Sequence, residues 1–167
     1  MINRIKSILL STSLCSLLFS MASCDSFDCP INNVVYGTYG FYVNENGVES
    51  AVNVLDTLTV VTAGSDSILV NRIQDVGSVE LPVSYSATTD TLVFRFTDIN
   101  GLMREDSVFI DKENTPHYES PDCPASMFHY VTAVRHTNIL IESISIVNPN
   151  IDYNVSENFK IFFHSGN

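Results

Sequence analysis

The sequence predicts an all-β protein, an immunoglobulin-like two-sheet β-sandwich of about nine strands. Short segments of alternating apolar and polar residues follow one another, and clusters of Asn, Asp, Gly and Pro separate them. Beyond the N-terminal segment, no window of about 11 or more residues has helical periodicity. The chain has no tryptophan, so the buried Trp of antibody domains is absent and the prediction concerns architecture alone.

Residues 1–23 have the order of a bacterial export signal. A basic start precedes an apolar run over residues 8–21, and two small residues precede Cys24. A cysteine in that place resembles the lipobox of bacterial lipoproteins, in which the thiol is lipidated before cleavage. We therefore expect three parts: a signal peptide over residues 1–23, a lipidated N-terminus and tether over 24–32, and a single β-sandwich domain over 33–167.

The strands are predicted from period-two alternation of β-branched and aromatic residues. The clearest is 91–97, where Leu92, Phe94 and Phe96 share one face. Turn residues at 44–47, 63–66, 98–101 and 148–150 separate the segments. The expected strands lie near residues 34–43, 54–62, 67–71, 78–83, 91–97, 103–110, 126–136, 139–147 and 158–164.

The segment 139–147 is irregular, because its apolar register shifts near Glu142 and Ser143. A β-bulge there would return both halves to one face of the sheet. A solvated sheet end is the alternative, and the pattern alone does not separate the two.

Two cysteines remain once Cys15 in the apolar run and Cys24 are set aside. In an exported protein a disulfide between Cys29 and Cys123 is the natural expectation. It would close a loop of about 94 residues, for which the chain-entropy model gives roughly 4.6 kcal/mol. A metal site is the rival interpretation, but no CxxC or paired His accompanies these thiols, and we expect no metal or other cofactor.

The chain is strongly acidic after residue 23. Removal of Arg4 and Lys6 leaves six of the eight basic residues against all 19 acidic ones, a net charge of −13. Nucleic-acid binding needs clustered Lys and Arg, so this class of function is excluded. Attachment to a membrane is expected to come from the N-terminal lipid rather than from a basic patch.

Several segments together resemble a family of small Bacteroidetes lipoproteins known only as a domain of unknown function. They are Cys29 just after the lipobox, Asp56–Val60, Val79–Val83, His117–Cys123 and Glu157–Phe163. The resemblance implies a location and a fold but supplies no activity.

Four tripeptides consist of Asp, then Ser or Thr, then an aliphatic residue. This form is similar to the acceptor motif of O-glycosylation in Bacteroidetes. The alternative is a turn residue followed by the first buried position of a strand. The candidate O-glycosylation sites are Thr57, Ser67, Thr91 and Ser107.

Few residues indicate catalysis. The chain has no GxSxG, no Cys-His arrangement and no Gly-rich phosphate loop, so we do not expect an enzyme. The segment 98–101 with Glu105 and Asp106 lacks the spacing of a calcium loop and favours an Asn-Gly hairpin. The four histidines form no metal-binding pair and are expected at the surface or rim: His117, His129, His136 and His164.

An aromatic cluster near the start of the domain is a candidate binding platform. Its tyrosines are Tyr36, Tyr39 and Tyr42, with Gly37 and Gly40 beside them, which fit a bulge or the close approach of a ligand. Core packing is the commoner use of such rings.

The sequence thus predicts a lipid-anchored cell-envelope protein in the outer membrane, on the periplasmic face or the cell surface. Its domain would bind or scaffold another envelope protein or a glycan. A glycan-binding accessory lipoprotein and a divergent envelope enzyme remain as alternatives. An exposed row of the three tyrosines would favour the first, and a deep pocket with converging Asp, Glu and His the second.

Overall fold

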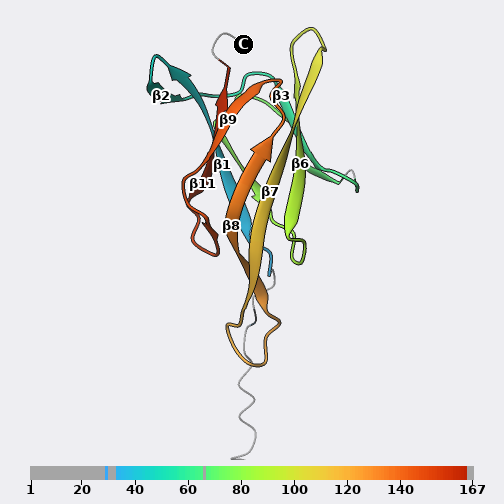
Figure 1. The fold of residues 1–167 in the computed structure, drawn as a ribbon. Helices are drawn as coiled ribbons and strands as arrows, with labels where there is room; N and C mark the ends of the chain where they lie inside the picture. Colours follow the sequence, from blue (N-terminus) through green and yellow to red (C-terminus); the bar gives the residue numbers. More distant parts are fainter. Residues whose placement is uncertain (1–28, 30–32, 66, 165–167) are drawn as a thin grey trace, which may run out of the picture.

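The computed structural model describes residue 29 and residues 33–65 and 67–164, and this part of the chain is all-β (Figure 1). The prediction of a two-sheet sandwich is confirmed. Eleven strands form among the described residues: β1 (Tyr36–Glu45), β2 (Val48–Ala51), β3 (Thr57–Thr62), β4 (Ile68–Ile73), β5 (Ser78–Pro82), β6 (Thr89–Thr97), β7 (Met103–His117), β8 (Ser126–His136), β9 (Ile141–Ile146), β10 (Asn150–Ile151) and β11 (Glu157–Phe163).

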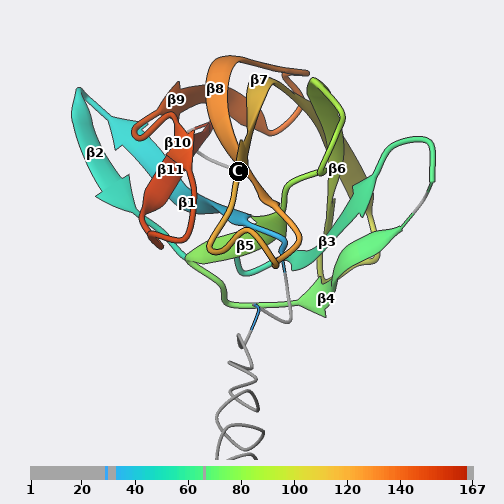
Figure 2. The ribbon, with the colours of Figure 1, turned by 90° about the horizontal axis from the view of Figure 1, so that it is seen from below.

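The strands form a five-stranded and a six-stranded sheet. The first has the order β2-β1-β11-β9, with β5 also paired to β1, and the second has the order β10-β8-β7-β6-β3-β4. The first and last long strands, β1 and β11, pair in parallel, whereas the other named pairs are antiparallel. Seen along its length, the molecule has both sheets curving around one interior (Figure 2).

The core lies between the inward faces of the two sheets. Alternation on β6 buries Leu92, Phe94 and Phe96, as the sequence predicts. From the opposite sheet, Tyr39 stacks on Phe159 with ring centroids 4.6 Å apart. Tyr39 also meets Phe94 edge-on at 6.1 Å, so one aromatic cluster joins the two layers.

A buried carboxylate holds the connection between the two sheets. Asp106 points inward from β7 and is fully buried. It accepts hydrogen bonds from Thr137 Oγ1 (2.6 Å) and from the backbone N–H groups of Ile139 (2.9 Å), Leu140 (2.7 Å) and Ile141 (3.0 Å). These residues form the passage from β8 to β9, where the chain leaves the six-stranded sheet. Burial opposes ionisation of Asp106, but the four donors lower its pKa below the ordinary value.

The irregularity in β9 is a bulge. Phe162 pairs with Ser143 while Phe163 pairs with Ile141, so Glu142 is the extra residue. Ile141 is buried and Ile144 packs against the core on the same side. The bulge therefore resolves the alternatives that the sequence left open.

Among the described residues, the chain forms no helix with the length and apolar character that crossing a bilayer requires.

Candidate functional site

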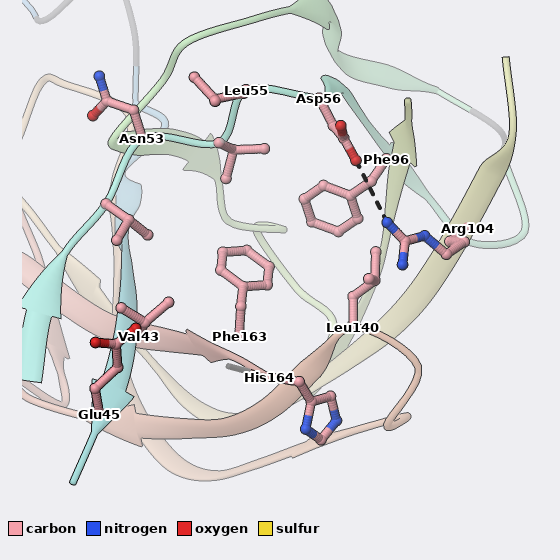
Figure 3. A pocket seen from close by; sticks show the side chains of 12 residues that line it. Val43, Glu45, Asn53, Leu55, Asp56, Phe96, Arg104, Leu140, Phe163 and His164 are labelled. Atoms are coloured by element: carbon pink, nitrogen blue, oxygen red, sulfur yellow. Dashed lines mark ion pairs between the residues drawn. The ribbon is translucent and has the colours of Figure 1, made fainter. Parts of the chain in front are cut away.

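An open cavity of about 530 Å³ lies at one end of the sandwich (Figure 3). Its walls are the ends of β1 and β11, parts of β6 and β7, and the segment 52–56 that links β2 to β3. This segment crosses from β2 in one sheet to β3 in the other. Val52 N–H donates to the Phe41 carbonyl of β1, and Val54 exchanges backbone bonds with Val76 in the link between β4 and β5. One wall of the cavity is therefore a sheet-to-sheet crossing.

The floor of the cavity is apolar. Phe96 from β6 and Phe163 from β11 meet edge-on, with ring centroids 5.5 Å apart, and both point into the hollow (Figure 3). Val54 and Leu140 complete this floor. Leu55 lies at the mouth with 75% of its surface exposed.

Polar side chains surround the floor. Asp56, just before β3, and Arg104, near the start of β7, form an ion pair with Oδ2 and Nη2 3.7 Å apart. Glu45 lies at the end of β1. His164 follows β11, and its Nε2 lies 2.7 Å from Asn138 Oδ1. With two carboxylates and one guanidinium around an apolar floor, the cavity suits an apolar group that carries a nearby positive charge.

A second hollow of about 730 Å³ lies at the opposite end of β3. It is bordered by the β3–β4 turn, the end of β5 and the start of β6. Two of the candidate O-glycosylation residues, Ser67 and Thr91, line it. Ser67 is exposed and Thr91 is half-buried.

Behind this second hollow lies a buried polar network that sequence reasoning missed. The Lys112 side chain is fully buried, and its ammonium donates to the carbonyls of Ser84 (2.9 Å) and Ala87 and to Asn114 Oδ1 (3.1 Å). Asp90 lies 3.8 Å from the same nitrogen. Burial lowers the pKa of Lys112, and Asp90 opposes that shift.

His129 belongs to this network, so the expectation that it lies at the surface is wrong. It points inward from β8 and is buried. Its Nδ1 lies 2.7 Å from Asn114 Oδ1, which already accepts from Lys112, so Nδ1 carries the proton and donates. Burial, with the charge of Lys112 nearby, lowers the pKa of His129 to about 4.

The three tyrosines of the proposed platform do not form an exposed row. Tyr39 is 1% exposed and belongs to the core. Tyr36 and Tyr42 lie six residues apart on the outer face of β1. There the Tyr42 hydroxyl donates to Glu157 Oε2 at 2.9 Å. A Cβ at position 40 would meet this carboxylate at 2.0 Å, so the group that approaches Gly40 closely is the Glu157 side chain. The platform prediction is therefore wrong for Tyr39.

The other sequence-based sites have mixed outcomes. Cys24 lies outside the described residues. Cys29 and Cys123 are joined by a disulfide, with Cα atoms 5.4 Å apart. Asp98 forms a hairpin turn in which its Oδ1 accepts from the N–H groups of Asn100 and Leu102. In the part of the chain that the structure describes, no three His, Cys, Asp or Glu residues are placed to hold a metal ion.

Thr57 and Ser107 are half-buried. Thr57 Oγ1 accepts a bond from Gln74, and Ser107 exchanges hydrogen bonds with Thr137. Because Asp106 is the buried acceptor described above, the tripeptide that contains Ser107 has a structural role whether or not it is modified.

These features define a class: an all-β sandwich domain, closed by a disulfide, with an open apolar site at one end. The chain matches the model of a family of unknown function, DUF6452, over residues 57–163, more than half of its 167 residues. The protein belongs to this family. No curated protein and no solved structure matches it. The matched region runs from β3 to the end of β11, so it includes Phe96 and Arg104 but not Glu45.

Proposed function

We propose that the protein is a Bacteroidetes lipoprotein, held in the outer membrane by lipid on Cys24, whose sandwich is a non-catalytic binding module for another envelope protein. The export pattern of residues 1–23 supports the anchor. The disulfide between Cys29 and Cys123 supports an exported location, because such bonds persist in oxidising compartments.

The end cavity is the observation that carries the binding role. Its volume is in the range of sites that take a small ligand or a few side chains. The exposed Leu55 extends the apolar floor to the rim, where a partner would bury it. Because Asp56 is paired with Arg104, Glu45 leaves the rim with one excess negative charge, so the partner segment would present an apolar side chain beside a Lys or Arg.

The glycan alternative loses its main support, because it depended on an exposed row that included Tyr39. Binding is preferred to catalysis because three of the polar side chains of the cavity already engage protein partners. Asp56 pairs with Arg104, and His164 contacts Asn138.

Photo-crosslinking tests the binding role. A photoreactive amino acid at Leu55 in the full chain should give a discrete crosslinked envelope protein in native cells. The same probe at Ile68, an exposed residue on β4 that does not line the cavity, is the control and should not. Charge reversal by Glu45→Lys should weaken the crosslink several-fold, whereas Glu113→Lys, at an exposed position on β7, should leave it unchanged. Equal crosslinking from positions 55 and 68 would contradict a site at the cavity.

The anchor has its own test. Cys24→Ala should move the protein from the membrane to the soluble fraction without changing its unfolding midpoint. A variant that stays in the membrane fraction would rule out the lipid anchor.

A further inference from the structure

The end of the sandwich opposite the cavity carries exposed tyrosines. Figure 1 shows the β7–β8 connection at the lower end and the β6–β7 turn at the upper end. Tyr118 in the lower connection is 62% exposed, and Tyr85 and Tyr153, whose hydroxyls contact Ala125 and Ser126 beside that connection, are also exposed. We call these three residues the tyrosine end.

Ring contacts and hydrogen bonds fix two of these side chains in place. Tyr153 lies edge-on against Phe128 at 5.0 Å and against His117 at 6.0 Å, while His117 stacks on Phe128 at 4.3 Å. The Tyr153 hydroxyl contacts Ser126 Oγ, and the Tyr85 hydroxyl donates to the Ala125 carbonyl at 3.1 Å. Tyr153 and Tyr85 are therefore preorganised, and these two side chains lose little conformational entropy when something covers them.

The disulfide brings the N-terminal tether to the same end. Cys123 lies in the β7–β8 connection, between Tyr118 and β8, and it is bonded to Cys29. If the proposed lipid is on Cys24, five residues separate it from Cys29, and an extended chain of that length spans at most roughly 17 Å. The tyrosine end is thus held within reach of the lipid headgroups, and this step rests on the proposed function.

The chemistry of this end suits a bilayer interface. Tyrosine rings favour the headgroup region, where the ring is shielded and the hydroxyl stays hydrated. The segment 113–134, which supplies Tyr118, contains no Lys or Arg, while Glu113, Glu119 and Asp122 are acidic. Attraction to anionic phosphate surfaces is therefore absent from this segment, and zwitterionic headgroups such as phosphatidylethanolamine suit it better.

We propose that the tyrosine end rests in the headgroup layer of the bilayer that carries the lipid, so that the domain stands upright with its cavity facing away from the membrane. β7 runs between the two ends, with Arg104 at the cavity and His117 beside Tyr153. Thirteen steps along the strand separate these two residues, so the cavity would lie at most roughly 43 Å from the membrane surface.

Tryptophan fluorescence tests this orientation, because the chain has no native tryptophan. Tyr118→Trp places one reporter at the tyrosine end. Ile99→Trp places a control reporter in the β6–β7 turn, where Ile99 is 97% exposed. Each full-length lipidated protein is incorporated into phosphatidylethanolamine-rich vesicles, with and without lipids brominated near the headgroup. Sedimentation with the vesicles is measured first, followed by quenching by bromine and by aqueous iodide.

We expect bromine to quench Tyr118→Trp by about half and the vesicles to protect it from iodide, while Ile99→Trp stays fully open to iodide. Equal behaviour of the two reporters in sedimenting protein would overturn the orientation and leave the anchor intact. Protein that does not sediment would overturn the anchor itself. Iodide protection of Tyr118→Trp in the soluble Cys24→Ala background would show that another protein surface covers this end, which would also overturn the proposal.

Discussion

Replacement of Asp106 by alanine removes the acceptor of four hydrogen bonds at the passage between the sheets. The N–H groups of Leu140 and Ile141 belong to buried residues and would lose their partner without access to water. Each such loss costs about 1.5–2 kcal/mol when the acceptor is charged. Thr137 and Ile139 are exposed residues whose donors water can reach. The free energy of unfolding should therefore fall by about 3–4 kcal/mol, a large share of the stability of an ordinary domain.

Urea unfolding followed by tyrosine fluorescence or circular dichroism measures this loss. Asp106→Asn should recover much of it, because its amide oxygen can still accept from the N–H groups of Leu140 and Ile141 while its NH₂ group faces the Thr137 hydroxyl, which can accept, and only the Ile139 N–H loses its partner. Asp98→Ala is a matched control, since Asp98 also accepts two backbone N–H bonds but lies in an exposed turn, and its loss should be much smaller. A loss below about 1 kcal/mol for Asp106→Ala would refute the view that this carboxylate holds the passage from β8 to β9.

Three further measurements probe the rest of the molecule. His129 has a pKa of about 4 when folded, so stability should fall as the pH drops from about 6.5 to 4, by up to roughly 3 kcal/mol, and His129→Gln should flatten the urea midpoint over that range. Reduction of the bond between Cys29 and Cys123, which are 94 residues apart, should lower stability by roughly 4.6 kcal/mol, and an unchanged melting temperature in reductant would contradict this. If Ser67 or Thr91 is glycosylated, the native protein will exceed the mass of lipid plus polypeptide, and Ser67→Ala or Thr91→Ala should remove part of the excess; equality of the two masses excludes modification.

Most strands follow from local pattern, and β7 shows where that pattern ends. The alternation of residues 103–110 predicts the first half of β7, but the strand continues to His117. Its inward positions there are Lys112 and Asn114, which read as solvated residues in the sequence. Their side-chain N–H groups donate to backbone carbonyls of residues 84–87, which lie more than twenty residues away in the sequence. Local sequence does not contain that information.

The prediction that Tyr39 belongs to a binding platform failed for a reason that was available in the sequence. Residues 36 and 42 share one parity on a strand and residue 39 has the other, so a strict period of two separates Tyr39 from its neighbours. No pattern in the sequence, by contrast, indicated the cavity. Its floor joins Phe96 and Phe163 with the crossing segment 52–56, and only the sheet topology brings these together.

β7 links the features on which these proposals depend. From one end to the other it presents Arg104 to the cavity, Asp106 to the passage between sheets, Lys112 to the buried network and His117 to the tyrosine end. β6 pairs with residues 103–111 of this strand and β8 with residues 108–117, so its whole length is hydrogen-bonded to a neighbouring strand. A partner at the cavity and a bilayer at the tyrosine end would therefore be held at a fixed separation. It follows that Cys24→Ala should abolish membrane attachment while leaving the intrinsic affinity of the cavity unchanged, whereas Asp106→Ala, by loosening the joint between the sheets, should weaken that affinity even in protein that stays anchored.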